Sequence, residues 1–514
     1  MTTIHNHNPR IELQFRLRDG ISFTVRTLFA YQSQRSLVNP AATANITIRG
    51  THFAPSTDEA INVLFRDVPI ERLLQSNDLC TVTMLDAAGR RHPDIIGQAK
   101  VVRPTVVERQ GRPEDATLIQ LQGLGSELLN YQIFWHPHIA GQNNLGGIGW
   151  LARAKGKLPS GRPDEVLRSI YETFLNDKYI YTLADGRKIN QALRPHLAGF
   201  ADSLAKTALK AMGMESALWA TLQRYQDAPW GELFVDLEHE LGVTRHIRAE
   251  GGASTGNVIA AEDASRLDRV GLYFRPTPFD FDAWDRLASQ DAWGFSYEDA
   301  DRMGEGEQLD RNEGRLYNFF WAPMKSVYSA FDQLSMAFNQ SGGLLPIYDE
   351  ESIKRHGLRR LEQGTEYVEM VSDADQKTGN LTPQQMFQAA TKASKLNEHL
   401  VKRTLQLQQW FGYGDQFLEG ALQTRGRIGP DSQHGARIGS VLTRKRDGYQ
   451  FYVTGISQQW QFPGPHMTTW QVQRGHDPRA YRKWWQGKLA EHKKKLSGRF
   501  INLLYQPKDG IGIT

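Results

Sequence analysis

The chain has 514 residues, which is too long for one ordinary hydrophobic core, and we expect roughly three to four domains. Hydrophobic residues make up 40% of it and charged residues 23%, values that exclude a mostly disordered chain. The net charge of +4 is too small for its length to indicate general nucleic-acid binding. The single cysteine, Cys80, excludes an internal disulfide framework and fits assembly in a reducing cytoplasm.

The start of the chain, MTTIHNHNPR, is polar, and no apolar run reaches the length of about 18 residues that a membrane helix needs. We therefore expect neither a signal peptide nor a membrane anchor.

Residues 1–125 show the period-two alternation of strands. Apolar residues from Ile11 to Leu17 alternate with polar ones, and Asp19-Gly20 is typical of a hairpin turn. Further strands are predicted at 46–48, 63–65, 82–85 and 118–121. Closing such a sheet removes its edges, so a small antiparallel barrel or sandwich is expected.

Residues 126–245 show a helical period instead. Pro163 suits the first turn of a helix, and the apolar residues from Val166 to Phe174 recur at helical spacing. Leu193–Met214 and Ala217–Tyr225 are predicted to be helical in the same way. The glycines between Gly141 and Gly149 are expected to form a loop.

The next part, residues 246–475, mixes both patterns. A strand is predicted at Val270–Arg275, an acidic surface loop at 285–312, and a long helix that begins near Thr382 and continues to Leu400. At 448–475 the alternation predicts two antiparallel strands. Its phase slips by one residue at Gly455, which indicates a β-bulge there.

Three segments resemble phage baseplate hub proteins, the tail-tube-like barrel family of contractile-tailed phages. The meander motif, residues 448–475 with YQFYVTGISQQW and MTTWQVQRG, resembles two strands that close the second barrel of the family. The DEESI motif, residues 348–359 (YDEESIKRHGLR), resembles a segment between a strand and a long helix. The YNFF motif, residues 316–320 (LYNFF), resembles a family strand. The family usually has histidine where Gln458 stands.

The resemblance implies an α+β fold of two tube-protein-like antiparallel β-barrels with a helical insert and a basic C-terminal extension. Residues 1–125 would form the first barrel and 126–245 the helical insert. Residues 246–475 would form the second barrel with its loop and helix insertions, and 476–514 the extension.

The resemblance also implies a structural role without enzymatic activity. Hub proteins form homotrimers whose six barrels surround a channel and join the sixfold tail tube to the threefold central spike. The implied partners are the spike, a tail-tube or tube-initiator protein, baseplate wedge proteins and, as a further candidate, a tape-measure protein. Neither a membrane nor a specific nucleic acid is implied. The protein would be assembled in the host cytoplasm and would reside in the tail baseplate of the virion.

The basic extension offers candidate residues for docking on a neighbouring subunit. Tryptophan and arginine are favoured anchors in protein interfaces, and the extension contains Trp484, Trp485, Arg479, Arg482 and Lys483. The alternatives are a solvated basic helix and a nucleic-acid contact through stacking and phosphate neutralisation.

The sequence predicts no catalytic, cofactor-binding or metal site. His239-Glu240 begins a zinc-protease pattern, but position 243 is valine and supplies no second ligand. His136 and His138 lack a nearby third ligand. The glycines near Gly147 lack the strand and helix of a dinucleotide site. A pair of carboxylates assembled by folding stays open, so a tail-associated peptidoglycan hydrolase is an alternative function. The hub of a phage-like contractile injection system is another.

Overall fold

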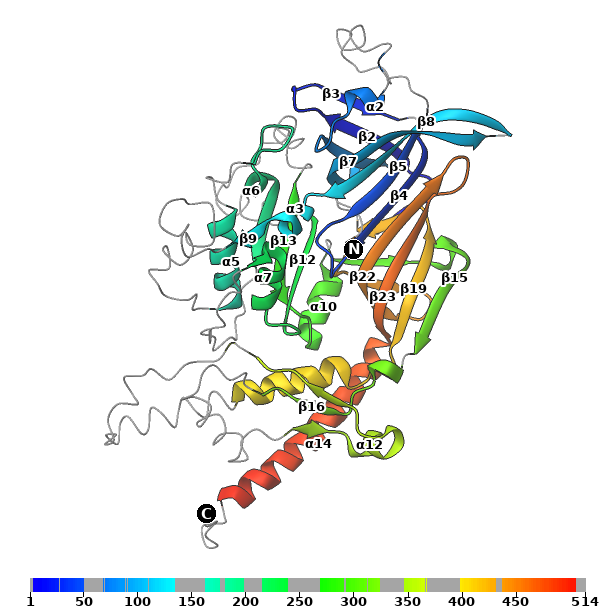
Figure 1. The fold of residues 1–514 in the computed structure, drawn as a ribbon. Coiled ribbons are helices and arrows are strands. Elements are labelled where there is room, and N and C mark those ends of the chain that lie inside the picture. Colours follow the sequence, from blue (N-terminus) through cyan, green and yellow to red (C-terminus); the bar gives the residue numbers. More distant parts are fainter. Residues whose placement is uncertain are drawn as a thin grey trace, which may run out of the picture.

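The computed structural model describes residues 3–49, 68–134, 162–175, 181–197, 215–238, 269–290, 293–323, 346–367, 398–430 and 437–504, apart from a few single positions within these ranges. The fold is α+β and mainly β (Figure 1). Predicted features at 63–65, 136–152 and 239–243, and most of the predicted helix from Thr382 onward, lie outside the described residues.

A 13-stranded sheet forms the centre of the molecule. Its N-terminal half contains seven strands: β2 (Arg10–Arg16), β3 (Ser22–Val25), β4 (Leu28–Ser36), β5 (Thr43–Arg49), β6 (Leu79–Leu85), β7 (Arg91–Arg109) and β8 (Arg112–Gly123). Its C-terminal half contains six: β14 (Gly294–Tyr297), β15 (Arg302–Arg311), β19 (Leu418–Arg425), β21 (Val441–Arg444), β22 (Gln450–Gln461) and β23 (Met467–His476). The main path runs β15-β19-β23-β22-β4-β5-β8-β7-β6-β2-β3.

The two halves join where β4 pairs with β22 in antiparallel register. Gln32 lies opposite Gln459, and Ser36 lies opposite Gly455. Each half buries a core of its own. One core contains Phe15, Ile46 and Cys80, and the other contains Phe295, Val453 and Trp470.

Several predicted elements are confirmed. Strands β5, β6 and β8 cover the positions predicted at 46–48, 82–85 and 118–121. The meander motif forms β22 and β23, and their pairing register shifts between Val453 and Gly455, where the bulge was predicted.

Helices and a small sheet lie beside the N-terminal half of the large sheet (Figure 1). The helices include α3 (Ser126–Asn130), α5 (Pro163–Phe174), α6 (Ile189–Ala192) and α7 (Leu218–Tyr225), whereas α10 (Phe281–Ser289) contacts β14 and β21 of the C-terminal half. Three strands, β10 (Leu193–Leu197), β12 (Gly231–Leu237) and β13 (Val270–Pro276), form a sheet in the order β10-β13-β12, and β9 (Gln132–Phe134) pairs with β11 (Glu215–Ala217). A third core contains Ile170, Leu222 and Phe274.

The helices α5 and α7 confirm the predictions for 163–174 and 217–225, and Glu165 of α5 accepts a hydrogen bond of 3.0 Å from the Arg162 amide. The predicted helix at Leu193–Met214 is wrong at its start, because Leu193–Leu197 form β10. This strand is fixed by parallel pairing with β13, a partner distant in sequence. The part at 126–245 is thus not purely helical. The predicted domain division stays a prediction, and the small sheet takes strands from both sides of the boundary at 245.

The predicted surface loop at 285–312 is also wrong. The segment contains the end of α10, then β14 and β15, because β14 pairs with β21 and β15 pairs with β19. Its acidic residues are divided between elements: Asp285 lies on α10, Asp299 and Asp301 lie in a 3-10 helix, and Glu305, Glu307 and Asp310 lie on β15.

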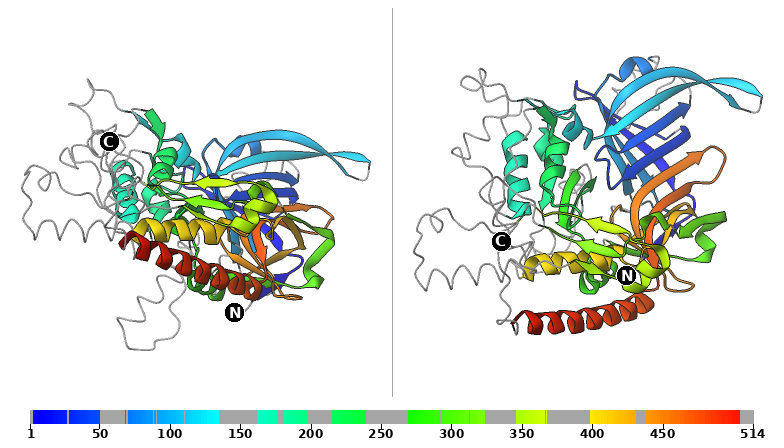
Figure 2. Two further views of the ribbon diagram at one scale, coloured as in Figure 1. Left: turned by 90° about the horizontal axis from the view of Figure 1, so that it is seen from below. Right: turned by 60° about the horizontal axis from the view of Figure 1, so that its bottom comes forward.

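The lower part of the molecule in Figure 1 holds the other two motifs and the C-terminal helix. Strands β16 (Phe319–Trp321), β17 (Ile347–Tyr348) and β18 (Arg360–Glu362) form a small sheet beside helix α12 (Glu350–His356). Helix α14 (Pro478–Leu504) runs next to a helix over residues 398–411 in both views of Figure 2. The start of the chain, β1 (Thr3–Asn6), pairs with β20 (Arg427–Pro430) in the C-terminal half.

Candidate functional site

The joint between the two sheet halves contains a buried polar cluster centred on Asp94 of β7. The Asp94 carboxylate accepts hydrogen bonds from the hydroxyls of Tyr31 and Ser33, the latter at 2.6 Å. It also accepts from Arg35 at 3.2 Å and from Gln458 of β22 at 2.7 Å. Burial raises the pKa of Tyr31 well above its usual value, and Asp94 raises it further. The cluster therefore ties strands of both halves to one carboxylate.

Arg35 extends this cluster to β12 of the small sheet. Its guanidinium donates to Asp236 at 2.7 Å, and Asp236 also accepts from the Ile438 amide at 3.2 Å. Burial opposes the charge on Arg35, but Asp236 and Asp94 outweigh it and raise its pKa. Arg35 thus links the N-terminal half to the small sheet, and both carboxylates that it binds also accept hydrogen bonds from the C-terminal half.

A second buried arginine, Arg437, lies next to Asp236. It donates to the Leu237 carbonyl at 3.0 Å, and its guanidinium carbon lies 4.8 Å from the Trp293 ring centroid. Burial lowers the pKa of Arg437 well below its usual value, while Asp236 acts in the opposite direction. Cation–π contact with Trp293 replaces part of the hydration that the guanidinium loses.

Arg474, at the end of the meander motif, holds the base of α14. Its guanidinium carbon lies 3.6 Å from the Trp410 ring centroid and 4.6 Å from that of Phe417. It donates to the Trp410 carbonyl and, at 3.3 Å, to the hydroxyl of Tyr481 on α14. Burial lowers its pKa, and Tyr481 partly opposes this effect.

The backbone around Arg474 explains the Arg-Gly pair of the motif. Arg474 has φ of 57°, in the left-handed region. Its side chain lies among the rings of Trp410, Phe417 and Tyr481, which we call the Arg474 cage. At Gly475, any side chain would place its Cβ 2.3 Å from the Phe451 ring. Only glycine therefore allows β23 to pack against Phe451.

The YNFF and DEESI motifs form one unit around Asn318. The Asn318 side chain accepts a hydrogen bond of 2.7 Å from the Arg359 amide and donates one of 2.7 Å to the Gly357 carbonyl. Its backbone carbonyl accepts from the Asp349 amide at 2.9 Å. Asp349 caps α12 and binds Lys488 of α14 at 2.7 Å. The structure thereby brings two motifs and the C-terminal helix together.

The predicted docking tryptophans lie against the chain itself. Trp484 is stacked on Tyr413, with ring centroids 4.8 Å apart, and Trp485 is only 8% exposed. Both side chains therefore serve first to seat α14 on the body of the protein.

The predicted docking cations differ in their surroundings. Arg482 forms an ion pair with Asp285 and lies 5.0 Å from the Phe281 ring centroid. Arg479 and Lys483 are exposed. Docking on a neighbouring subunit stays a proposal. A partner can reach the two exposed cations and also the Arg482 side chain, which is 43% exposed.

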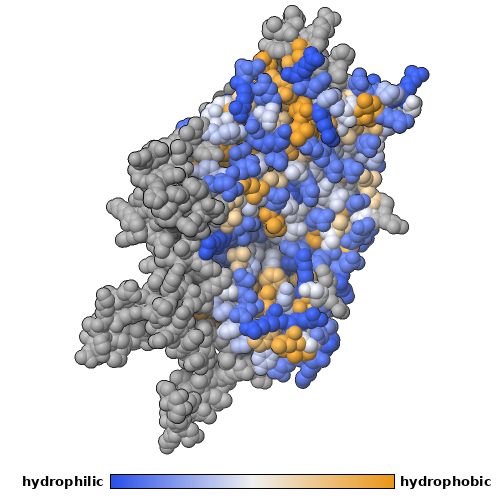
Figure 3. Space-filling view, in the orientation of Figure 1, coloured by the Kyte–Doolittle hydropathy of each residue, from blue (hydrophilic) through white to orange (hydrophobic). Residues whose placement is uncertain are grey.

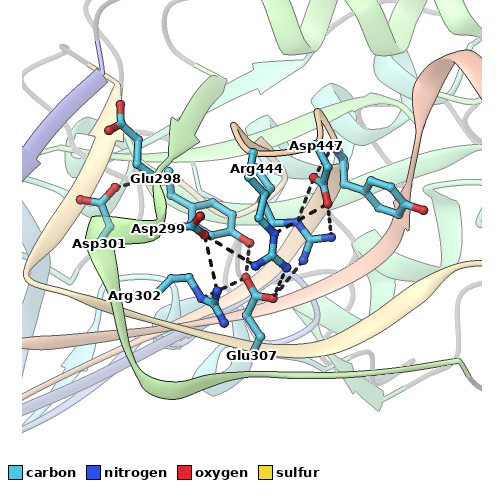
Figure 4. A network of polar contacts seen from close by, with 10 residues as sticks. Glu298, Asp299, Asp301, Arg302, Glu307, Arg444 and Asp447 are labelled. Carbon is cyan, nitrogen blue, oxygen red and sulfur yellow. Dashed lines mark hydrogen bonds and ion pairs between the residues drawn. The ribbon is translucent and has the colours of Figure 1, made fainter.

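Figure 4 shows an ion-pair network near the bulge of β15. Glu307 accepts hydrogen bonds of 3.0 Å from Tyr297, Arg444 and Arg446, and Arg444 also binds Asp447 at 2.8 Å. Next to it, Asp301 accepts from His5 at 2.9 Å and His7 at 3.0 Å. The Glu307 contacts fix β15 to the end of β21 and the turn after it, and the Asp301 contacts fix the start of the chain to the 3-10 helix that precedes β15.

Within the described ranges, no group of three or more His, Cys, Asp or Glu side chains is arranged to hold a metal ion. No described helix is both long and apolar enough to cross a membrane. Large exposed hydrophobic side chains such as Val38, Val106 and Leu358 lie on separate segments, and the face in Figure 3 is largely hydrophilic where it is described.

The sequence reasoning missed the Asp94 cluster and the Arg474 cage. Gln458 was noted only as a departure from the histidine usual in the family. Arg474 is part of the meander motif, so the motif indicated the segment that forms the cage but not its aromatic partners.

No model of a known protein family matches the chain, and no curated protein matches its sequence. Similar solved structures include the 43 kDa tail protein of prophage MuSo2 from Shewanella oneidensis, with 11% identity, coverage of 92% of this chain and 98% of that chain, and a TM-score of 0.45. A tail protein from Neisseria meningitidis MC58 has 10% identity, coverage of 90% and 96%, and a TM-score of 0.44. A component of the type VI secretion system of E. coli has 7% identity, coverage of 90% and 76%, and a TM-score of 0.35.

The chain is similar to phage tail proteins.

Proposed function

We propose that this protein is the hub of a contractile phage tail baseplate. The observation that carries the proposal is that the three motifs occupy joints of the fold. The meander motif supplies β22, which joins the two sheet halves, and Arg474, which holds α14. The YNFF and DEESI motifs meet around Asn318. Residues that resemble a family in sequence therefore also make the contacts on which this architecture depends.

The two halves of the large sheet fit a role in symmetry matching. Each half has its own core, so each can act as one barrel-like unit, and three chains would present six such units around a channel. Such a ring meets a sixfold tail tube on one face and a threefold central spike on the other. A cyclic trimer of this kind needs heterologous contacts, in which different surfaces of neighbouring chains meet.

The end strands β15 and β3 are suited to these contacts. In the described part of the sheet each pairs with a single strand, so each has an edge that another chain can cover. Wedge proteins would contact the outside of the ring, where α14 displays Arg479 and Lys483. The tail tube or its initiator, and a tape-measure protein, would meet the ring along its axis. The same geometry serves a baseplate in a virion or in a related injection particle.

The solution mass tests the proposal. Light scattering on the purified chain, alone and with a co-expressed spike protein, is expected to give three times 58.3 kDa in at least one condition. A monomer in both conditions would overturn the ring. Hydrolysis of purified cell wall tests the alternative, a peptidoglycan hydrolase. Hydrolysis by the wild-type chain that is lost when one buried carboxylate is neutralised would favour that function instead.

A further inference from the structure

The outer part of the β7–β8 hairpin projects from the body of the protein in Figures 1 and 2. In the described part of the sheet, residues 101–109 of β7 pair only with β8, and residues 112–115 of β8 pair only with β7. We call these residues the arm. None of them whose exposure is described is buried. An isolated two-stranded ribbon is marginally stable in water, so a partner that covers the arm would stabilise it.

One face of the arm is apolar and acidic. Directly opposed residues of antiparallel strands share a face. From base to tip, the opposed pairs on this face are Val102 and Ile119, Pro104 and Thr117, Val106 and Asp115, and Glu108 and Pro113. The pair at the base packs in the N-terminal core, whereas Val106 is 61% exposed. We call the outer part of this face, residues Pro104, Val106, Glu108, Pro113 and Asp115, the acidic surface.

The two carboxylates of the acidic surface are available to a partner. Glu108 and Asp115 are exposed, and neither forms an ion pair with a described residue. On the opposite face of the arm, Glu114 is instead neutralised by Arg49 at 3.3 Å. The acidic surface therefore combines an exposed valine and two exposed prolines with two unpaired negative charges.

A second surface, in the loop after α12, presents Leu358 on a fixed backbone. Asn318 donates to the Gly357 carbonyl and accepts from the Arg359 amide, each at 2.7 Å, so it holds both neighbours of Leu358. The Leu358 side chain is nevertheless 62% exposed. A single exposed leucine is ordinary on a protein surface. One whose backbone is already fixed loses less conformational entropy when a partner covers it, which suits an anchor residue.

Cations flank Leu358 on both sides in the chain. Lys354, Arg355 and Arg359 are exposed, and none of their side chains forms an ion pair with a described residue. Lys354 and Arg355 lie in the last turn of α12, away from the glutamates of its first turn. We call Leu358 and these three cations the basic surface. It matches the acidic surface in composition, with the opposite charge.

We propose that the acidic surface of one copy of the chain binds the basic surface of a neighbouring copy, with Leu358 against Val106. This inference rests on the proposed hub function and adds the residues through which neighbouring chains meet. The arm lies near the top of Figure 1 and α12 near the bottom, so one chain does not join the two surfaces by itself. Two different surfaces that meet make a heterologous contact, the kind that closes a cyclic ring.

The charges also determine which surfaces meet. Two arms brought together would place carboxylates against carboxylates, and two basic surfaces would place cations against cations. Like charges across an interface are strongly unfavourable, so neither surface suits contact with its own copy. A nucleic acid would neutralise the cations but would leave Leu358 without an apolar partner.

Cysteine cross-linking tests the contact. The single native cysteine, Cys80, is fully buried, so Val106→Cys and Leu358→Cys each supply one accessible thiol. A short bismaleimide is expected to join a mixture of the two single variants into a covalent dimer and to join neither variant with itself. The chain that carries both cysteines is expected to give a covalently closed trimer on a denaturing gel.

Val38→Cys is the matched control, because Val38 is 75% exposed and lies outside both surfaces. It is expected not to cross-link to Leu358→Cys. A trimeric preparation in which Val106→Cys and Leu358→Cys do not cross-link would overturn the inference. Cross-linking of Val38→Cys as efficient as that of Val106→Cys would overturn it as well.

Charge reversal tests the chemistry of the contact at exposed positions. Glu108→Lys with Asp115→Lys is expected to raise the concentration at which the trimer dissociates by about tenfold or more, and so is Lys354→Glu with Arg355→Glu. All four changes in one chain restore opposite charges and are expected to recover much of the loss. A combined variant that dissociates as readily as the weaker of the two double variants would overturn the pairing.

Arg103→Glu with Arg112→Glu is the control for the arm. Both side chains are exposed on its opposite face, so this variant is expected to dissociate like wild type. Light scattering separates the two levels of the proposal. A wild-type chain that stays monomeric, alone and with the spike, contradicts the hub function itself, whereas a trimer without the cross-link contradicts only this contact.

Discussion

Gln458 of β22 donates a hydrogen bond of 2.7 Å to Asp94 of β7, although 364 residues separate them in the chain. This contact closes the polar cluster over the joint between the two sheet halves. Burying a carboxylate is costly unless donors surround it, and four side chains serve Asp94 in this way. The joint is therefore sensitive to the loss of any one donor.

Gln458→Ala is expected to lower the free energy of unfolding by about 2 kcal/mol, because it removes a hydrogen bond to a buried charged group. Gln459→Ala is a matched control, since the neighbouring side chain is exposed on the other face of β22. Urea denaturation followed by circular dichroism measures both. Equal changes in the two variants would contradict the role of Gln458 at the joint.

Arg474→Lys is expected to loosen α14. Lysine keeps the positive charge but loses the planar group that stacks on Trp410 and reaches the Tyr481 hydroxyl, at a cost of about 2 kcal/mol. Limited trypsin digestion is expected to cut α14 faster than in wild type. Arg479→Lys makes the same chemical change at an exposed position of the helix and is expected to leave the rate unchanged. A wild-type cleavage rate in Arg474→Lys would show that the cage does not hold the helix.

Asn318→Asp is expected to disrupt the unit formed by the YNFF and DEESI motifs. The substitution replaces the donor to the Gly357 carbonyl by a second acceptor, so two oxygens face each other. Amide hydrogen exchange at 346–365 is expected to become faster by a factor of about ten or more. Asn45→Asp, on an exposed position of β5, is the control. Unchanged exchange in Asn318→Asp would mean that the segment is held by other contacts.

Acid is expected to destabilise the protein through His466 and His476. Burial lowers the pKa of His466 from 6.5 to about 4 and that of His476 from 6.5 to about 3. Both folded-state values lie below the unfolded value, so the unfolded state binds more protons as the pH falls below about 6.5. The stability that the neutral rings contribute is therefore lost between about pH 6.5 and 4 for His466, and down to about pH 3 for His476.

The urea concentration at the unfolding midpoint is therefore expected to be lower at pH 5 than at pH 7. In His466→Gln the difference between these two midpoints is expected to be smaller than in wild type. His356→Gln, on the half-buried side chain that ends α12, is the control and is expected to leave the difference unchanged. The same pH dependence in His466→Gln and wild type would contradict the assignment to His466.

Local patterns in the sequence predicted the elements whose structure is decided locally. The alternation around Phe451 and its shift at Gly455 were sufficient to predict β22 and its bulge. Pro163 was sufficient to predict where α5 begins. Leu193–Leu197 was predicted as helix because its strand conformation depends on β13, which lies more than 70 residues later. The acidic segment at 285–312 was predicted as a loop because its pairing partners, β19 and β21, lie more than 100 residues later in the chain.

The contacts of the Asp94 cluster and of the Arg474 cage could not be predicted from the sequence for a related reason. Arg35 and Asp236 are 201 residues apart, and nothing near either residue in sequence indicates the other. A buried charge can be recognised from sequence only when its partner is close along the chain. The motifs indicated which segments matter, but not that Asn318 and Arg474 are the residues through which they act.

The pairing of β1 with β20 also bears on how the chain is made. Residues 3–6 leave the ribosome long before residues 427–430 exist. At about 5–20 residues per second, the interval is roughly 20–80 s. During that time β1 lacks its partner, and β4 likewise waits for β22, so its edge is open to pairing with other nascent chains. Synthesis of this protein therefore includes a period in which the N-terminal half must be kept apart from its neighbours.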